Sequence, residues 1–347
     1  WDITTGSSNV IIAVIDSGIA YDHPDLAANM WRNPGETPND GIDNDGNGLV
    51  DDVFGYDFRS GDNDPMDPLG HGTHVAGTIG AVGNNNSGVT GVMHKVKLMA
   101  LKAGDVDNNL PDDAILSAID YAIKKGARVI NASFTREGSC SQAEYDALRD
   151  ANTAGVMVLA AAGNVGSNND GASVFPASYS VGTSCGEALP NVIAVAAINQ
   201  TGAKASFSNF GPTSVQIAAP GVNINSTNPG TPNATNDYQF LSGTSQATPH
   251  VTGVVGLLLS VNQNLTVAQI RNAILNTGDV SSDLKGFVST GRRLNAFNAL
   301  NSIAPTLTVM VAKNGTGTGT VASTPAGINC GGDCNERFPG GATVILT

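Results

Sequence analysis

Runs of consecutive apolar residues alternate along this chain with segments in which apolar residues recur every three or four positions. A short continuous apolar run is typical of a strand that is buried on both faces of a parallel sheet. Such runs predict strands at 10–15, 96–101, 127–131, 156–161 and 192–196. The helical periodicity predicts helices at 73–82, 111–125, 142–154, 251–261, 266–276 and 294–303.

The alternation of strands and helices predicts an α/β fold with a mostly parallel central sheet and helices on both faces. In such sheets the ligand site lies beyond the carboxyl ends of the strands. After residue 303 the pattern changes to short strands at 307–311, 320–323 and 343–346, separated by Gly/Thr turns. We therefore expect one large domain over residues 1–303 and a small β-rich extension over 304–347. The last predicted strand runs to the end of the chain, which leaves open whether the extension is truncated.

Composition narrows the class of protein. A hydrophobic content of 41% in 347 residues supports a sizeable core, and the absence of an 18-residue apolar run argues against a membrane span. The net charge of −13 argues against nucleic acid as a partner. An even number of cysteines in a Lys-poor chain favours disulfides and an oxidising compartment, so we expect a secreted protein, read here as a processed form without its signal peptide. The cysteines are Cys140, Cys185, Cys330 and Cys334.

The helix expected at 251–261 has no polar face, which predicts that it is buried. It follows Gly243-Thr-Ser-Gln-Ala-Thr-Pro-His250, whose hydroxyls suit a helix start. Ser245 would then lie beside free N–H groups and the positive end of the helix dipole, where a nucleophilic hydroxyl is favoured. The alternative is that Thr244 or Ser245 only caps the helix.

Three further residues decide between these alternatives. Asp16 follows a predicted strand, and His71 lies in a second small-residue helix start at 70–77. A hydroxyl attacks a carbonyl efficiently when an imidazole takes its proton and a carboxylate orients that imidazole. Asn164, which also follows a strand, supplies an amide N–H that could hold the resulting oxyanion. Taken singly, Asp16 and Asn164 fit turn residues and His71 fits a cap.

Taken together, four segments resemble the signature segments of the subtilisin-like serine peptidases, the subtilases, in the family's order of Asp, His, Asn and Ser. They are Asp16-Ser-Gly18, His71-Gly-Thr-His-Val-Ala-Gly77, Ala161-Ala-Gly-Asn164 and Gly243-Thr-Ser-Gln-Ala-Thr-Pro-His250. The resemblance covers about residues 10–303 and implies a secreted serine endopeptidase of the bacterial type, with 1–303 as its catalytic domain. It implies that the nucleophile, the general base and acid, the orienting carboxylate and the oxyanion donor are Ser245, His71, Asp16 and Asn164.

The resemblance also places the substrate cleft. Ser133, Phe134 and Thr135 occupy the family's substrate-pairing edge strand, and we add Gly163 to the expected substrate-binding residues. Thr135 and Arg136 stand where the family often has Gly-Gly, so the specificity pocket should differ in depth and polarity.

Insertions in two segments that flank this pocket in the family each contain a cysteine. We predict a Cys140–Cys185 disulfide that braces the rim of the pocket. A Cys330–Cys334 disulfide would close a turn in the extension. The alternative for both pairs is buried free thiols.

The acidic stretch 43–52 alternates oxygen-bearing side chains with glycine, the spacing by which a loop wraps a hard cation. The closing acid comes earlier than in an EF-hand loop and is Asp rather than Glu. The predicted calcium ligands are Asp43, Asp45, Asn47, the carbonyl of Leu49 and Asp52. The alternative is a solvated acidic loop held by Asx-turns. Asp62, Asp64 and Asp67 continue the acidic run, and whether they complete this site or another is left open.

A second calcium site is implied by the resemblance alone, so we expect two or more structural calcium ions. One carboxylate, an Asn side chain and several carbonyls hold the ion in the family. The corresponding residues are Asp25, Val82, Asn85, Ser87 and Val89. The loop is one residue longer than the common form, which leaves open whether Asn84, Asn85 or Asn86 is the ligand.

Three other functions were weighed. An inactive subtilase fold used for binding usually lacks a triad residue, and none is lost here. A serine esterase of the α/β-hydrolase kind predicts a Gly-x-Ser-x-Gly elbow and the order Ser, Asp, His, and neither is found. His71 and His74 could share a zinc ion, but no Glu follows in the metallopeptidase pattern. The expected partners are therefore protein or peptide substrates and a removed propeptide, which the family implies, with the enzyme a monomer.

Overall fold

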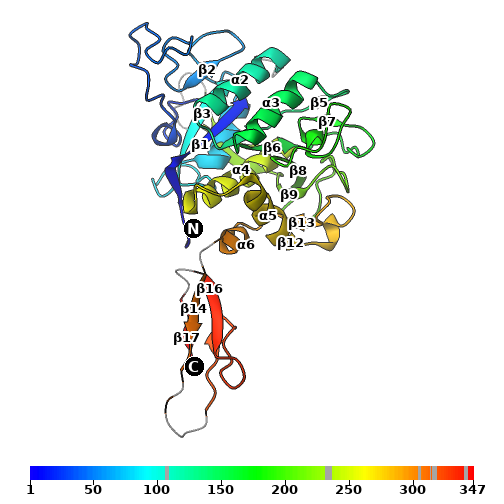
Figure 1. Cartoon of the computed structure of the whole chain (residues 1–347). Coiled ribbons are helices and arrows are strands. Elements are labelled where there is room, and N and C mark those ends of the chain that lie inside the picture. Colours follow the sequence, from blue (N-terminus) through cyan, green and yellow to red (C-terminus); the bar gives the residue numbers. More distant parts are fainter. Residues whose placement is uncertain (106–108, 231–236, 304–305, 313, 315–318, 340–342) are drawn as a thin grey trace.

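A nine-stranded sheet forms the middle of the protein (Figure 1). The computed structural model describes all residues except 106–108, 231–236, 304–305, 313, 315–318 and 340–342. The strand order is β12-β13-β9-β8-β6-β4-β1-β3-β2. All neighbouring strands pair in parallel except β12 with β13. The predicted α/β class with a mostly parallel sheet is therefore confirmed.

Every strand and helix predicted in the large domain is present, with ends shifted by a few residues. The strands of the sheet are β1 (Gly6–Asp16), β2 (Gly55–Asp57), β3 (Lys95–Lys102), β4 (Val129–Ala132), β6 (Met157–Ala161), β8 (Val192–Ile198), β9 (Ile217–Pro220), β12 (Asp279–Val280) and β13 (Arg292–Arg293). The helices are α1 (His71–Gly80), α2 (Asp112–Lys124), α3 (Gln142–Thr153), α4 (Thr244–Val261), α5 (Val267–Thr277) and α6 (Ala296–Ile303). Two further antiparallel pairs join β5 (Arg136–Glu137) with β7 (Val174–Phe175), and β10 (Ile224–Asn228) with β11 (Asp237–Leu241).

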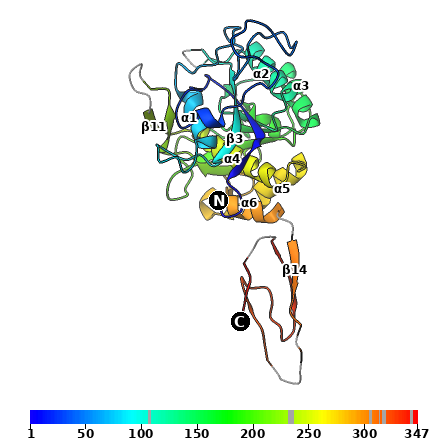
Figure 2. The ribbon, with the colours of Figure 1, turned by 90° about the vertical axis from the view of Figure 1, so that its left-hand side faces the viewer.

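Two separate cores explain why the central strands are mostly apolar. Along β1, Ile12 and Val14 enter a core shared with α1, α4, α5 and α6, while Ala13 and Ile15 enter a core shared with α2 and α3. Figures 1 and 2 show these two sets of helices on opposite faces of the sheet. Successive side chains of a strand point to opposite faces of the sheet, so a strand between two cores needs apolar residues on both faces.

Helix α4 begins at Thr244, earlier than its apolar pattern, and contains Pro249. Proline has no N–H, so the carbonyl of Ser245, four residues earlier, loses its usual helical donor. The hydroxyl of Ser133 replaces that donor at 2.9 Å. The helix therefore continues through the proline without an unsatisfied buried carbonyl.

The extension forms two small antiparallel pairs outside the large sheet. β14 (Thr306–Met310) pairs with β16 (Asn335–Pro339), and β15 (Ser323–Thr324) pairs with β17 (Ile345–Leu346). Figures 1 and 2 both show these strands beyond α6, as a lobe separate from the body. The strand predicted at 320–323 is present only from Ser323, and β16 was missed because its sequence, Asn-Glu-Arg-Phe-Pro, does not alternate.

Both predicted disulfides, Cys140–Cys185 and Cys330–Cys334, are present, so the free-thiol alternative is wrong. Within the described residues, no helix is long and apolar enough to cross a membrane.

Candidate active site

The carboxyl ends of three neighbouring strands carry polar side chains to one edge of the sheet. β4 lies between β1 and β6, and all three run in parallel. Asp16 is the last residue of β1, Ser133 follows β4, and Asn164 follows β6. Helices α1 and α4 begin at the same edge with His71 as the first residue of α1 and Ser245 as the second of α4.

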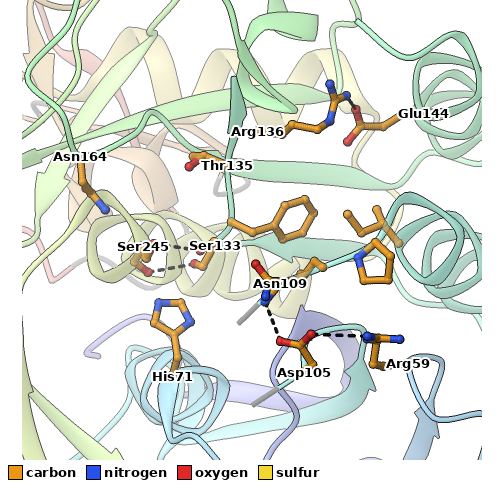
Figure 3. Close-up of a pocket in the computed structure, with 14 residues that line it drawn as sticks. Arg59, His71, Asp105, Asn109, Ser133, Thr135, Arg136, Glu144, Asn164 and Ser245 are labelled. Carbon is orange, nitrogen blue, oxygen red and sulfur yellow. Dashed lines mark hydrogen bonds and ion pairs between the residues drawn. The ribbon is translucent and has the colours of Figure 1, made fainter. Parts of the chain in front are cut away.

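A cavity of about 560 Å³ opens at this edge (Figure 3). Its walls include His71, Asn164 and Ser245, although these residues come from positions far apart in the sequence. Figure 3 shows the His71 ring on the same side of the cavity as Ser245. The fold therefore brings three of the four predicted catalytic residues to one cavity, and the fourth, Asp16, does not line the cavity but contacts the imidazole of His71.

The imidazole of His71 is held by Asp16. Nδ1 of His71 lies 2.7 Å from Oδ1 of Asp16, a carboxylate that is only 2% exposed. The N–H of Ser17 donates to the same oxygen at 2.8 Å. Burial alone would lower the pKa of His71, but the charge and hydrogen bond of Asp16, with the charge of Asp67, raise it above its ordinary value.

The Ser245 hydroxyl donates to the carbonyl of Ser133 at 2.8 Å in this structure. In return, the Ser133 hydroxyl donates to the carbonyl of Ser245 at 2.9 Å. This reciprocal pair fixes the start of α4 against the end of β4. The Ser245 hydroxyl lies on a single side-chain torsion, so rotation about that torsion releases it from the carbonyl of Ser133.

Two hydrogen bonds to its side-chain oxygen orient the amide group of Asn164. Oδ1 accepts the N–H of Thr244 at 2.8 Å and the Thr244 hydroxyl at 2.9 Å, which leaves the amide Nδ2 facing the cavity. A Cβ placed on Gly243 would lie 2.7 Å from Oε1 of Gln246, 3.4 Å from that Nδ2 and 3.6 Å from the backbone N of Ser245. The two nitrogen atoms therefore both lie beside Gly243, and a pair of neighbouring N–H donors is what an oxyanion requires.

Gly163 contributes backbone geometry rather than a wall of the cavity. Its φ is 112°, and a Cβ there would lie 2.4 Å from Nδ2 of Asn209, so only glycine fits. Its N–H donates to the Thr244 hydroxyl at 3.0 Å. Its contact with substrate stays a prediction.

The remaining walls of the cavity include the expected edge-strand residues Ser133, Phe134 and Thr135. Arg136 points along the cavity to Glu144 (Figure 3). The two side chains are 2.9 Å apart, and burial raises the pKa of Glu144 although the Arg136 charge opposes that shift. An ion pair therefore lines this part of the cavity, and its effect on the specificity pocket stays a prediction.

The Cys140–Cys185 disulfide does not line the cavity of Ser245. Cys140 instead borders a neighbouring cavity of about 550 Å³, together with Phe175. Its bracing of the specificity pocket stays a prediction.

The other two histidines near the site bind backbone carbonyls. Nε2 of His74 lies 3.0 Å from the carbonyl of Ile224 and 3.2 Å from that of Gln239, and burial lowers the pKa of His74 to about 4. Nδ1 of His250 lies 2.9 Å from the carbonyl of Gln246. Because His74 is committed to the β10–β11 hairpin and His71 to Asp16, the geometry gives no support to a zinc ion shared by His71 and His74.

The acidic loop holds a cluster of oxygen atoms. Asp45 and Asp52 lie with Glu36 so that one carboxylate oxygen of each is within 4.8 Å of the others, which is close enough to hold a metal ion. Glu36 was not predicted because it precedes the acidic stretch by several residues, and its Oε2 is buried without a partner. The ammonium of Lys125 contacts Asp45 and lies 3.5 Å from Asp52.

The other predicted ligands of this loop shape its backbone. The Asp43 carboxylate accepts the N–H groups of residues 46, 47 and 48. Oδ1 of Asn47 accepts the N–H of Leu49 at 2.7 Å, and its Nδ2 donates to Asp52 at 2.8 Å. The Asx-turns of the alternative interpretation are therefore present beside the cluster, and ligation by Asp43, Asn47 and Leu49 stays a prediction.

The second candidate metal site centres on Asp25, which is fully buried. Its carboxylate accepts the Asn85 amide and, at 3.0 Å, the N–H of Val89, and its carbonyl accepts the N–H of Val82 at 2.8 Å. The N–H of Ser87 donates to Oδ1 of Asn85 at 3.1 Å. Of the three consecutive asparagines, Asn85 is therefore the one that reaches Asp25.

Tyr238 of β11 also reaches this carboxylate, and its hydroxyl donates to Asp25 at 2.9 Å. No sequence signal points to this contact, since the two residues are separated by 213 positions.

Comparisons with known proteins agree with this geometry. A protein-family model with the description "Subtilase family" matches residues 7–304 of this chain. The chain belongs to the subtilase family of serine endopeptidases. It is 39% identical over 300 residues to the thermophilic serine proteinase of Bacillus sp. (strain AK1), covering 86% of this chain and 64% of that protein. It is 38% identical to thermitase of Thermoactinomyces vulgaris, covering 86% of this chain and 91% of thermitase.

A solved structure, that of a cold adapted subtilisin-like serine proteinase, superposes with a TM-score of 0.64 at 27% identity. The match covers 81% of this chain and 87% of that one. The subtilase therefore shares its fold with an experimentally determined member of the family.

The contact between His71 and Asp16 predicts a raised pKa for the imidazole of His71. In the full-length Ser245→Ala variant, NMR should give His71 a pKa above 6.5, and Asp16→Asn should lower it because the neighbouring charge is lost. A base must be neutral to accept a proton, so hydrolysis should fall as pH decreases through that pKa. Asp120→Asn, on the exposed face of α2, is the control, and an equal shift in both variants would contradict the assignment.

Proposed function

We propose that this subtilase hydrolyses peptide bonds of proteins through an acyl-enzyme intermediate. Ser245 attacks the substrate carbonyl, His71 takes its proton as general base and returns it as general acid, and Asp16 orients the imidazole. The observation that carries the proposal is the 2.7 Å contact between Nδ1 of His71 and Asp16 at the wall of the cavity that contains Ser245. With the Nδ1 proton directed to Asp16, Nε2 is the nitrogen that accepts the hydroxyl proton.

Attack on the carbonyl places a negative charge on its oxygen. Nδ2 of Asn164 and the N–H of Ser245 are the donors for that charge, and the latter lies in the first turn of α4, near the positive end of its dipole. Thr244 already holds Asn164 by two hydrogen bonds, so little reorganisation is needed when the charge develops. Preorganisation of this kind is usually the largest single contribution to such catalysis.

Substrate would bind as an added strand. Ser133, Phe134 and Thr135 follow β4 and line the cavity, where their backbone can pair with an extended peptide. Phe134 lies with Leu110 and Ile115 on the apolar part of the wall, which suits an apolar substrate side chain. The substrates are therefore proteins and peptides that present an extended segment.

Calcium would stabilise the fold at two places. Carboxylate and carbonyl oxygens are the ligands that calcium prefers, and Glu36, Asp45 and Asp52 offer three such groups in one cluster. Lys125 offsets part of their mutual repulsion. Asp25 and the 82–89 loop provide the second set. A bound ion would screen the buried charges and fix both loops; it takes no part in the hydrolysis.

We also propose the context in which the enzyme works. Two disulfides favour secretion into an oxidising compartment. The family implies that a propeptide is removed before activity, and we propose a monomer. Residues 1–303 would form the catalytic unit and 304–347 an extension without a role in the chemistry, which agrees with the absence of described extension residues from the wall of the cavity.

Replacing the proposed nucleophile tests the mechanism. In subtilisin, loss of the nucleophile costs about 10⁶-fold in kcat, and we expect Ser245→Ala to lose casein hydrolysis to a similar degree without loss of fold. Ser242→Ala removes an exposed hydroxyl three residues away and should leave activity unchanged. Retained hydrolysis by a correctly folded Ser245→Ala protein would refute the assignment.

Chelation tests the role of calcium. In the inactive Ser245→Ala background, which excludes self-digestion, EDTA should lower the melting temperature. Calcium at 100 times its Kd contributes about 2.7 kcal/mol to stability. Glu36→Gln and Asp25→Asn should each remove part of the calcium-dependent increase, whereas Glu137→Gln, an exposed acid elsewhere, should not. A melting temperature independent of calcium would argue against both sites.

Deletion of residues 306–347 tests the proposed boundary. The shortened chain should hydrolyse a small chromogenic peptide with unchanged kcat/KM, because no described residue of the extension lines the cavity. A strong fall in turnover of the folded protein would make the extension part of the catalytic unit.

A further inference from the structure

Asp67 is a buried carboxylate that has no part in the mechanism above. It is 2% exposed and lies four residues before His71. Oδ1 accepts the Ser17 hydroxyl and the N–H groups of residues 69 and 70, each at 2.9 Å. Oδ2 accepts the N–H of Thr73 at 2.8 Å and its hydroxyl at 2.6 Å. Five protein donors fill both oxygens, so Asp67 belongs to this edge of the sheet and not to the calcium loop.

Asp67 replaces the missing cap of α1. The N-cap residue is Gly70, which has no side chain and a φ of 100°. Asp67 accepts the N–H of Gly70 and that of Thr73, the third residue of the helix, while the Ser17 hydroxyl accepts the N–H of Gly72 at 3.0 Å. Acceptors at these positions satisfy the free N–H groups of a helix start, and a negative charge there is favoured by the helix dipole.

The same carboxylate reaches the end of β1. Ser17 donates its hydroxyl to Asp67 and its N–H to Oδ1 of Asp16, the oxygen that also contacts His71. We propose that Asp67 is a positioning residue of the active site: its buried carboxylate ties the start of α1, which carries His71, to the end of β1, which carries Asp16. This inference rests on the proposed roles of His71 and Asp16.

Asp67 also adds charge near the imidazole. Asp16 faces His71 from β1, Asp67 faces it from the loop before α1, and His74 of the same helix stays neutral because its pKa is about 4. From α4 the cavity receives only the neutral Ser245. The other charged groups on the cavity wall are Arg59, Asp105, Arg136 and Glu144, and they form two ion pairs. Loss of the Asp67 charge should therefore destabilise the imidazolium.

Asp67→Asn keeps the shape of the side chain but removes its charge. It also replaces one accepting oxygen by an NH₂ group, which cannot accept from the N–H and hydroxyl donors that face it. We expect the pKa of His71, measured by NMR in the full-length Ser245→Ala background, to fall. In the active enzyme, the acid limb of kcat/KM should move to lower pH with it. A peptide substrate should show kcat reduced by about 10-fold or more with KM little changed, since misplacement of a catalytic group acts on the chemical step.

Asp64→Asn is the matched control, because it removes the same charge from an exposed position of the same loop and should change neither pKa nor kcat. Ser17→Ala keeps the Asp67 charge and breaks its link to β1, so it should lower kcat without moving the pKa, even if Asp67→Asn does not fold. The proposal is overturned if either variant, corrected for the folded fraction, keeps wild-type kcat, or if Asp67→Asn leaves the pKa of His71 unchanged. The NMR titration needs no activity, so it separates this failure from undiminished hydrolysis by Ser245→Ala, which would instead remove the proposed function.

Discussion

The parallel pairing of β4 with β1 on one side and β6 on the other is the constraint on which the site depends. Parallel strands end at the same edge, so Asp16, Ser133 and Asn164 meet there although they are far apart in sequence. That pairing is stable because each strand is covered by helices on both faces, which favours apolar side chains along the strands. The buried polar side chain inside β4, that of Asn131, is satisfied by Ser133 and Thr252.

The helix starts complete the site, and neither relies on an ordinary cap of its own. Gly70 and Gly243 occupy the N-cap positions of α1 and α4 without side chains. Asp67 and Ser17 supply the acceptors for α1, and Asn164 accepts the N–H of Thr244 for α4. In both helices, the acceptors for the first N–H groups come from other segments, which connects each helix start to a strand end. The groups that satisfy the backbone therefore also fix the positions of His71 and Ser245.

The buried carboxylates of the active site and those of the acidic loop have different partners. The carboxylates of Asp16 and Asp67 are almost fully buried, yet each accepts at least one hydrogen bond from a backbone N–H. On the outer side of the fold, Glu36, Asp45 and Asp52 gather in one cluster, in which Lys125 pairs with Asp45 and Asp52. In our proposals, the first arrangement supports the imidazolium and the second holds a calcium ion.

The sequence by itself determined the fold class, the succession of strands and helices along the chain, and the family. These follow from local patterns, such as an apolar run beside Asp16 or the segment around Ser245. The Cys140–Cys185 pair was predicted from the resemblance to the family, and the Cys330–Cys334 pair from its short spacing. Only the tertiary structure decided that Glu36 joins Asp45, that Tyr238 reaches Asp25, and that Asp67 bridges the start of α1 and the end of β1, where the acidic run had left its role open. These contacts join segments brought together by strand pairing and helix packing, and a one-dimensional pattern contains no record of which distant donor will meet a given carboxylate.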